Sequence, residues 1–490
     1  MMMQRIHMIG VCGVAMGTLA LMLNERGHAV SGSDRNMYPP MSDVLAGSGV
    51  RLFEGFSADN IDSPDLVVIG NAISRGNPEV EYVLNARLPY LSMAQALYAF
   101  FLRDKEVVAV AGTHGKTTTT ALLAHLLEES GMSPSFFVGG VTRNYDANHR
   151  LGSGRYFVIE ADEYDSAFFE KVPKFVFYRP AHLLLTSLEF DHADIYRDLA
   201  EIELWFGRLV NMLPSGGTLL YAADYANLRA IAGRSPSRRF SYGSGGADFT
   251  CAFHGYDGDF SRLDIATPEG SFPVETRLFG HFNYANVLAA AAMARLLGAP
   301  EHGIARGLAS FLGVKRRQEC IYDAGGVKIY EDFAHHPTAV RYVLETMRER
   351  FPGARLWALY EPRSATSRRN VFQDVLPGSF AAADAVLIRA PYEGSAIPDS
   401  GRLDPVRLVH DISAIVPEAR LFPDAGGMLD YIGRTISLER ENVIVIMSNG
   451  AFDGIYDRIR VTMDSLAGGR PLRPAATSPV YGGGREGADD

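Results

Sequence analysis

Short apolar runs alternate with amphipathic segments along the first hundred residues. The runs at residues 6–9, 29–32 and 66–70 have the length of buried strands, and residues 17–25 carry apolar positions at helical spacing. Strands that alternate with helices are typical of a parallel sheet covered by helices. The pattern therefore predicts an α/β domain over residues 1–105.

Two further segments repeat this alternation. A charged stretch at 103–106 precedes a strand, a loop and a helix at 107–127, with another strand at 156–160, turn-rich strands at 235–273 and an apolar helix at 286–297. From residue 327 strands recur at 355–360, 385–389 and 443–447. We therefore predict a central domain over 106–313, a third α/β domain over 314–466, and a disordered tail over 467–490, which is rich in Gly, Pro and Arg.

Composition excludes several classes of protein. Among the 490 residues, 47% are hydrophobic and 21% charged, which is ordinary for globular domains. No run of 18 apolar residues occurs, and the net charge of −10 gives no overall attraction to nucleic acid or to anionic lipid. We expect neither nucleic acid nor a membrane as a partner.

Cysteine usage and the start of the chain bear on the compartment. The three cysteines, Cys12, Cys251 and Cys320, fit neither a disulfide framework nor a structural zinc site, which favours a reducing compartment. The apolar start could be read as a signal peptide. His7 and three glycines interrupt it, however, so a strand, a turn and a helix are the preferred interpretation. These features predict a cytoplasmic protein.

A glycine loop joins a strand to a helix at residues 107–118, which read VVAVAGTHGKTT. In such a loop backbone N–H groups and the helix N-terminus bind phosphate oxygens, Lys116 reaches the β/γ-phosphates, and the Thr117 hydroxyl ligates Mg²⁺. The residues expected around a nucleoside triphosphate are Gly112, Thr113, His114, Gly115, Lys116, Thr117 and Thr118. The alternative is a glycine turn with an incidental lysine, since Val110 stands where the general motif has its first glycine.

Carboxylates and a histidine follow two other apolar strands. The strand at 156–160 ends in EADEYD (160–165), and residues 188–194 read LEFDHAD. Because phosphoryl transfer needs oxygen ligands for Mg²⁺, Glu160 is a candidate metal ligand. His192 is a candidate ligand for a second ion or for the reacting phosphate. A solvated acidic turn and a structural histidine are the alternatives.

The first domain also carries glycines between a strand and a helix. Gly10, Gly13 and Gly17 follow the first strand, and Ser33 and Asp34 end the next one. The spacing is GxxGxxxG and not GxGxxG, so NAD binding is poorly supported, whereas the diphosphate of a sugar nucleotide would suit the loop. Tight packing of the helix on the strand, without a ligand, is the alternative.

The order of these motifs resembles the Mur ligase family. The shared segments are AGTHGKTTTT (111–120), EADE (160–163), FDH (190–192), GHFNYAN (280–286), KRR (315–317) and DFAHHPTA (332–339). The resemblance implies ATP-dependent amide formation and three domains. These are a Rossmann-like N-terminal domain that binds UDP, a central P-loop ATPase domain and a C-terminal Rossmann-like domain.

Other segments resemble the branch of the family that transfers a murein tripeptide. They include IGNAISRGNP (69–78), LEFDHADIY (188–196), EPRSATS (361–367) and MSNGAFDGI (447–455). Family members that add L-alanine instead have D-x-S-D at the acidic motif and His-Arg where Arg363-Ser364 stands here. The resemblance thus implies UDP-N-acetylmuramic acid and a murein tripeptide as substrates in peptidoglycan recycling, through an acyl phosphate. The alternatives are an alanine ligase, a non-catalytic nucleotide-sugar sensor and a folate-polyglutamate type ligase.

The resemblance also implies roles for individual residues. It assigns Lys116 to the ATP phosphates, Thr117 and Glu160 to Mg²⁺, and His192 to a second metal ion. It assigns Asn286 to adenine, Arg317 and Asp332 to the adenosine, and the loop Gly10 to Gly17 with Asp34 to UDP. The chain departs from the family in two ways: no lysine lies between Lys174 and Lys315, where some members carry a carbamylated lysine, and Ser187 stands where peptide ligases have Asn.

The peptide is expected to bind at strand ends of the third domain. Several carboxylates on the peptide suit an arginine clamp, for which Arg363 is the candidate. The residues expected near the peptide are His335, His336, Arg363, Ser364, Ser448, Asn449 and Gly450. For the two histidines, structural packing against Pro337 is the alternative. We expect a monomer or a weak homodimer.

Overall fold

The structure is a computed structural model that describes residues 2–35, 37, 41–391 and 399–466. The chain divides into two compact units, Met1–Arg317 and Gln318–Asp490, each of which is described by itself. The tail at 467–490, predicted to be disordered, lies outside the described residues.

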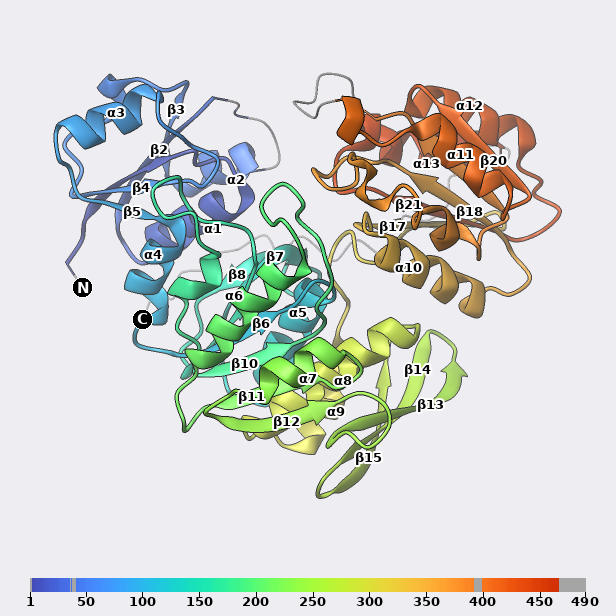
Figure 1. Cartoon of the computed structure of the whole chain (residues 1–490), viewed down its shortest axis with the longest axis horizontal. Coiled ribbons are helices and arrows are strands. Elements are labelled where there is room, and N and C mark those ends of the chain that lie inside the picture. The colour runs from blue at the N-terminus through green and yellow to red at the C-terminus, as the bar shows by residue number, and fades with distance from the viewer. Residues whose placement is uncertain (1, 36, 38–40, 392–398, 467–490) are drawn as a thin grey trace, which may run out of the picture. The chain divides into compact units, whose positions relative to one another are not determined.

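The first sheet, at the start of the first unit, has five parallel strands in the order β3-β2-β1-β4-β5 (Figure 1). Ile6 and Met8 of its middle strand are buried, which explains the apolar run in the sequence. The strands are β1 (Arg5–Ile9), β2 (Ala29–Asp34), β3 (Arg51–Glu54), β4 (Leu66–Ile69) and β5 (Tyr90–Ser92), and the helices are α1 (Val14–Glu25), α2 (Met41–Ser48), α3 (Pro78–Asn85) and α4 (Met93–Leu97). The predicted α/β pattern is confirmed.

The second sheet lies at the centre of the first unit and has the order β12-β11-β10-β6-β9-β7-β8. Its strands are β6 (Glu106–Ala111), β7 (Ser135–Thr142), β8 (Ala147–Arg150), β9 (Tyr156–Glu160), β10 (His182–Leu185), β11 (Thr218–Ala222) and β12 (Arg238–Tyr242). All pairs are parallel except β7 with β8. Because β6 lies between β9 and β10, the carboxyl ends of these three strands meet at one edge of the sheet.

Helices of the second sheet contribute an alanine-rich core. α5 (Lys116–Glu129) packs against α8 (His281–Leu296) and α9 (Glu301–Ser310), while α6 (Leu199–Asn211) and α7 (Ala226–Ala232) pack against each other. α8 begins five residues before the apolar run that predicted it, because Gly280 precedes its first turn. A separate antiparallel sheet contains β13 (Thr250–Asp257), β14 (Phe260–Thr267) and β15 (Gly270–Thr276).

The second unit contains a six-stranded sheet in the order β16-β17-β21-β18-β19-β20, in which β16 alone runs antiparallel to its neighbour. Its strands are β16 (Glu319–Ala324), β17 (Val327–Asp332), β18 (Arg355–Tyr360), β19 (Ala385–Arg389), β20 (Glu418–Phe422) and β21 (Asn442–Met447). Its helices are α10 (Pro337–Arg350), α11 (Pro405–Ser413), α12 (Ala425–Thr435) and α13 (Ile455–Leu466). The α/β pattern predicted from residue 327 onward is thereby confirmed.

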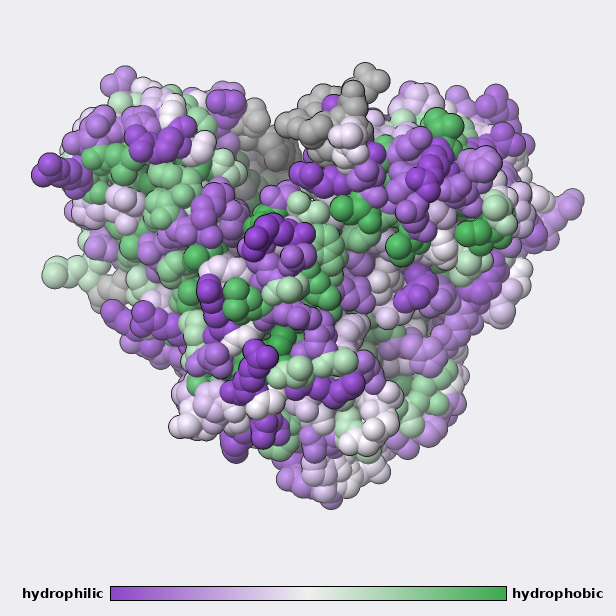
Figure 2. All heavy atoms as spheres, viewed as in Figure 1, coloured by the Kyte–Doolittle hydropathy of each residue, from purple (hydrophilic) through white to green (hydrophobic). Residues whose placement is uncertain are grey.

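Length and hydropathy decide whether a helix can cross a membrane. No helix in the described ranges combines the length and hydropathy needed to cross a bilayer. Figure 2 shows hydrophilic and hydrophobic side chains intermixed on the visible face of each unit. The large exposed apolar side chains, such as Val14, Leu204 and Val375, come from separate elements.

Candidate active site

The glycine loop after β6 is enclosed by the segment that follows β10. Gly112 has φ +142°, and a Cβ there would lie 2.2 Å from Thr186 Oγ1 and 2.8 Å from the amide nitrogen of Ser187. Only a glycine lets the two segments approach this closely. The first glycine of the predicted loop is therefore required by the neighbouring segment.

Ser187 fixes the conformation of the loop. Its Oγ accepts a hydrogen bond from the His114 amide at 2.8 Å, and its carbonyl accepts one from the Thr113 amide at 3.1 Å. The His114 ring in turn lies 3.0 Å from Glu189 Oε2. Two loop amides are thus used within the protein, which leaves the first turn of α5, where helix N–H groups have no carbonyl acceptor in the helix, as the donor set for an anion.

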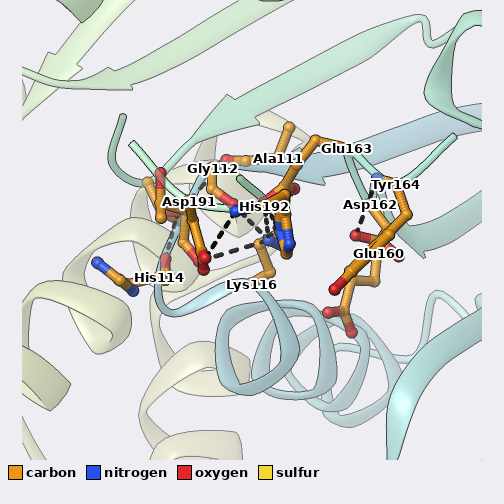
Figure 3. Close-up of polar contacts among 12 residues, drawn as sticks. Ala111, Gly112, His114, Lys116, Glu160, Asp162, Glu163, Tyr164, Asp191 and His192 are labelled. Atoms are coloured by element: carbon orange, nitrogen blue, oxygen red, sulfur yellow. Dashed lines mark hydrogen bonds and ion pairs between the residues drawn. The ribbon is translucent and has the colours of Figure 1, made fainter. Parts of the chain in front are cut away.

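Lys116, the first residue of α5, points back into the loop and toward a carboxylate. Its Nζ donates to the Gly112 carbonyl at 2.6 Å and to Glu163 Oε2 at 2.8 Å, and Glu163 Oε1 lies 2.9 Å from His192 Nε2. Figure 3 shows Lys116, Glu163 and His192 gathered at one point, with Glu160 and Asp162 to one side. Three segments that follow β6, β9 and β10 supply these side chains.

The charges of this cluster stabilise one another. Burial disfavours the Lys116 ammonium, but the carboxylates of Glu163, Asp162 and Glu160 outweigh it and raise the Lys116 pKa above its ordinary value. Burial also disfavours the His192 imidazolium, but the hydrogen bond to Glu163 and the nearby charges raise the pKa of His192 to about 9. The cluster thus contains two cationic groups with one shared carboxylate between them.

Glu160, at the end of β9, contacts the hydroxyl predicted to ligate Mg²⁺. Its Oε1 accepts from Thr117 Oγ1 at 2.9 Å, and its Oε2 accepts from the Gly139 amide at 2.7 Å. Burial raises the pKa of the Glu160 carboxyl. Arg317 Nη2 donates to Thr117 Oγ1 at 3.2 Å, so this arginine also reaches the pair. A hydroxyl and a carboxylate at this spacing are the oxygen ligands that Mg²⁺ prefers.

A second set of ligand atoms lies beside the first. One atom each from Asp162, Glu163 and His192 lies within 4.8 Å of the others. Lys174 Nζ lies 3.3 Å from Asp162 Oδ2. Burial would raise the pKa of Asp162, but the positive charges of Lys174 and Lys116 outweigh burial and lower this pKa. Two carboxylates and an imidazole fit a divalent cation.

Asn286 lies beneath the loop in the first turns of α8. Its Oδ1 accepts from Thr119 Oγ1 at 3.2 Å, and its Nδ2 donates to Asn283 Oδ1 at 3.1 Å. Gly115 has φ +79°, and a Cβ there would lie 2.3 Å from Asn286 Oδ1. The structure thus connects Asn286 to the phosphate loop, and its predicted contact with adenine stays a prediction. Thr118 is buried in the first turn of α5.

The first-domain loop after β1 is held by the strand beside it. The Gly10 and Val11 amides donate to the Ser33 carbonyl at 2.8 and 3.1 Å, and the Cys12 amide donates to Asp34 Oδ2 at 2.9 Å. Gly13 precedes the first residue of α1, so the first amides of that helix are the donors that remain for a phosphate.

Two of the residues predicted for this loop have structural contacts. A Cβ on Gly17 would lie 2.4 Å from Met41 Sδ, so this glycine lets α1 pack against α2. The Ser33 hydroxyl donates to Glu79, a fully buried carboxylate that Asn60 Nδ2 also contacts at 2.7 Å. These contacts favour the alternative that Gly17 serves helix packing without contacting a ligand.

In the second unit, residues after β17 form a tight turn. Asp332 accepts from the Gln318 amide and from the Ala334 amide, each at 2.8 Å. His336 caps α10 by accepting from the Thr338 amide at 3.2 Å, and its ring packs edge-on against Phe372. His335 Nδ1 lies 3.0 Å from the Phe333 carbonyl oxygen. These contacts favour the structural alternative for His336.

The ends of β18 and β21 bring the predicted peptide residues together. A Cβ on Gly450 would lie 2.0 Å from Arg363 Cδ, and the Gly450 amide donates to Ser448 Oγ at 2.9 Å. Ser364 instead caps a turn, since its Oγ accepts from the Ser367 amide at 3.0 Å. The side-chain oxygen of Asn449 is buried without a hydrogen-bond partner in the described part of the chain.

Sequence reasoning missed Glu163 and did not find the role of Ser187. Glu163 lies inside the EADE motif, but the pattern alone did not tell which carboxylate faces the lysine. The sequence did contain a signal for it: Glu163 follows the same strand as Glu160 and adds a second negative charge near the loop that carries Lys116. Ser187 departs from the family pattern, and the sequence alone indicates no function for it.

Comparisons with known proteins agree along most of the chain. Three family models match it: "Mur ligase family, catalytic domain" over residues 5–105, "Mur ligase middle domain" over 110–294, and "Mur ligase, glutamate ligase domain" over 316–450.

Individual relatives fall into two groups. The chain is 40% identical over 475 residues to UDP-N-acetylmuramate–L-alanyl-γ-D-glutamyl-meso-2,6-diaminoheptandioate ligase of Escherichia coli K12, which covers 94% of this chain and 98% of that protein. It is 33% identical over 446 residues to UDP-N-acetylmuramate–L-alanine ligase of Rubrobacter xylanophilus, covering 90% and 96%. The crystal structure of a murein peptide ligase from Psychrobacter arcticus matches with TM-score 0.69 and 34% identity, covering 94% and 98%.

Proposed function

Because the chain belongs to the Mur ligase family, we propose that it is an ATP-dependent ligase that joins UDP-N-acetylmuramic acid to the tripeptide L-alanyl-γ-D-glutamyl-meso-diaminopimelate. The observation that carries the proposal is the 40% identity, over 94% of the chain, to the Escherichia coli enzyme of that name. The 33% identity to an alanine ligase makes free L-alanine the second candidate amine. The carboxylate and histidine beside the phosphate loop argue against a sensor that only binds nucleotide.

The reaction needs an activated carboxyl group, because a free carboxylate is a poor electrophile. The lactyl carboxylate of UDP-N-acetylmuramic acid attacks the γ-phosphorus of ATP, which gives an acyl phosphate and ADP. The free amine of the peptide then attacks the acyl carbon, loses a proton and expels phosphate. Lys116 is the residue we assign to the transferring phosphoryl group, where its positive charge stabilises the transition state.

The residues near Lys116 fit a divalent cation, which we propose to be Mg²⁺. Thr117 and Glu160 would hold it, as their oxygens lie 2.9 Å apart, and Asp162, Glu163 and His192 would hold a second ion. A bound cation supplies positive charge that offsets the negative charge on the phosphate oxygens. We propose that Lys116 exchanges Glu163 for phosphate when ATP binds, which frees the Glu163 carboxylate for the second ion.

Substrate contacts elsewhere follow the expectations from the sequence. We assign UDP to the loop after β1 with Asp34, and the adenosine to Asn286, Arg317 and Asp332. The peptide is assigned to the strand ends of the second unit, with Arg363 as the carboxylate ligand. We also propose that the enzyme is cytoplasmic, because ATP is supplied in that compartment. We expect it to be a monomer or a weak homodimer.

Competition between amines tests the proposal. The purified protein receives ATP, Mg²⁺ and UDP-N-acetylmuramic acid with equal concentrations of L-alanine and the tripeptide, and the products are identified by mass spectrometry. The expected product is the UDP-N-acetylmuramyl tripeptide, formed together with ADP. A preference for L-alanine would replace the proposal with the alanine ligase, and ATP binding without either product would favour the sensor.

A further inference from the structure

A buried carboxyl group lies directly behind Arg363 in the second unit. Glu361, the residue after β18, is 0% exposed, and its Oε2 accepts a hydrogen bond from Ser448 Oγ at 2.5 Å. Its Oε1 has no hydrogen-bond partner in the part of the chain that the structure describes, and Arg363 Nη1 lies 3.6 Å from it. A buried acceptor left without a donor is unfavourable, so this atom calls for an explanation.

The loop after β21 closes on the same arginine. Gly450 lies so close that a Cβ would stand 2.0 Å from Arg363 Cδ and 2.2 Å from its Nε. Ser448 links both sides, because its Oγ donates to Glu361 and accepts from the Gly450 amide at 2.9 Å. Glu361 and Gly450, joined to each other by Ser448, therefore form a cradle that contacts Arg363 at its guanidinium and at Cδ.

We propose that Glu361 is a positioning residue, which fixes the guanidinium of Arg363 for a carboxylate of the peptide substrate. The inference rests on the proposed function. Glu361 is too deeply buried to touch the peptide, whereas the Arg363 side chain is 40% exposed. A guanidinium binds a carboxylate through two parallel hydrogen bonds only when its plane is held in one orientation.

The cradle supplies that orientation from both sides. The unpaired Oε1 attracts Nη1 from the buried side, and the backbone at Gly450 leaves no room for the side chain to swing toward the loop. Because the arginine loses little freedom when a carboxylate binds, the peptide gains affinity. Glu361 therefore acts on peptide binding and leaves the phosphoryl chemistry unchanged.

Steady-state kinetics of Glu361→Gln test the inference, with the KM values for tripeptide, ATP and UDP-N-acetylmuramic acid measured separately. The amide keeps the shape but loses the charge, so we expect the tripeptide KM to rise about tenfold while kcat and the other two KM values change by less than about twofold. Glu418→Gln is the matched control. It removes a carboxylate that pairs with Arg355 at 2.6 Å. Glu418 and Arg355 lie at the amino ends of β20 and β18, whereas Glu361 follows the carboxyl end of β18, so this variant should leave every KM unchanged.

A double-mutant cycle separates positioning from a structural role. In the Arg363→Ala background, Glu361→Gln should change the tripeptide KM no further, because its effect passes through the arginine. Gly450→Ala provides a second route that keeps the carboxyl group, and it should raise the tripeptide KM by displacing Arg363. Effects that multiply in the double variant, or a parallel rise in the ATP KM, would overturn the inference.

The wild-type enzyme distinguishes this inference from the function on which it rests. A wild type that makes no tripeptide product overturns the proposed function and, with it, the positioning role. Normal ligation of the tripeptide by the wild type, together with an unchanged tripeptide KM in Glu361→Gln and Gly450→Ala, overturns the positioning role alone.

Discussion

The first unit contains two loops of similar sequence that the structure builds in different ways. Both follow a buried strand, contain glycines and lead into a helix, at residues 10–17 and 112–116. In the first, the Gly10 and Val11 amides bond to the Ser33 carbonyl and the Cys12 amide to the Asp34 carboxylate. In the second, a buried lysine points into the loop and bonds to the Gly112 carbonyl.

The glycines specify the path of the chain in both loops, and we propose that the charged side chains specify the ligand. The first loop places a carboxylate at its amides and carries no lysine at the start of its helix. The second places a cation where phosphoryl oxygens would lie, held by Glu163. This difference supports our assignment of the triphosphate to the second loop and of a ligand with fewer negative charges, a sugar nucleotide diphosphate, to the first.

Removal of Lys116 should produce the largest effect on activity, because it removes the lysine that distinguishes the second loop from the first. We expect Lys116→Ala to lower kcat about 10²–10³-fold, because a single preorganised charge on a transferring group has that weight. The rate of ADP formation measures it, and circular dichroism confirms folding. Lys105→Ala is the control, since Lys105 Nζ donates to the Gly152 carbonyl at the amino end of β6. Near-normal turnover in folded Lys116→Ala would contradict the assignment.

The metal requirement of the second loop should respond next. Glu160→Gln keeps an acceptor for Thr117 but loses the charge, so half-maximal activity should need about ten- to a hundredfold more Mg²⁺. A titration of activity against Mg²⁺ gives the shift. The control, Glu106→Gln, removes a carboxylate that pairs with Arg155 at 2.7 Å at the start of β6, and it should leave the titration unchanged. An identical Mg²⁺ curve for Glu160→Gln would remove Glu160 from the metal site.

A smaller effect is expected in the first loop, on stability. Gly17→Ala would bring a Cβ within 2.4 Å of Met41 Sδ, and we expect a net loss of about 1–2 kcal/mol in the free energy of unfolding. Denaturant titration measures this loss. Gly47→Ala in α2 meets no atom within 4 Å and should stabilise the protein slightly. If Gly17→Ala instead kept full stability but raised the KM for the UDP substrate, the glycine would be a ligand contact.

The smallest expected effect is a pH dependence of the stability that Glu79 contributes through its contact with Ser33, at the end of the strand beside the first loop. Burial opposes the charge of Glu79, but His7, whose Nε2 lies 3.5 Å away, and hydrogen bonds from Ser33 and Asn60 outweigh it and lower the Glu79 pKa. Since the folded-state pKa lies below the unfolded one, this stability is present above the ordinary pKa of about 4.3 and is lost as pH falls through the folded value. The difference in Tm between the wild type and Glu79→Gln should therefore shrink from pH 7 toward pH 3. A constant difference would contradict the shift.

Sequence patterns predicted the strands that are buried on both faces. The run before Gly112 became β6, whose residues from Val107 to Ala111 are all buried, and such a run leaves little choice of structure. The strands β7, β8 and β16 were not predicted, because each contains partly exposed residues. Strand content was therefore readable where burial is complete.

The candidate site was predictable as a set of segments and not as a set of contacts. Strand order was enough to bring Lys116, Glu160 and His192 to one edge of the sheet. Which carboxylate turns toward the lysine depends on loop conformation, such as the left-handed φ of 55° at His192, and no spacing rule encodes that. The same holds for Ser187, whose hydroxyl acts on a loop 73 residues earlier in the chain.

If Lys116 binds the ATP phosphates, as we propose, its ion pair with Glu163 makes nucleotide binding an exchange reaction. The ammonium that meets the incoming phosphates is already bonded to a carboxylate at 2.8 Å, so phosphate must compete with Glu163 for the same three protons. The net free energy of binding is then the difference between these two interactions, so binding is weaker than it would be if Lys116 had no internal partner. We therefore expect the site to release ADP readily, because Glu163 can replace the departing phosphate at Lys116.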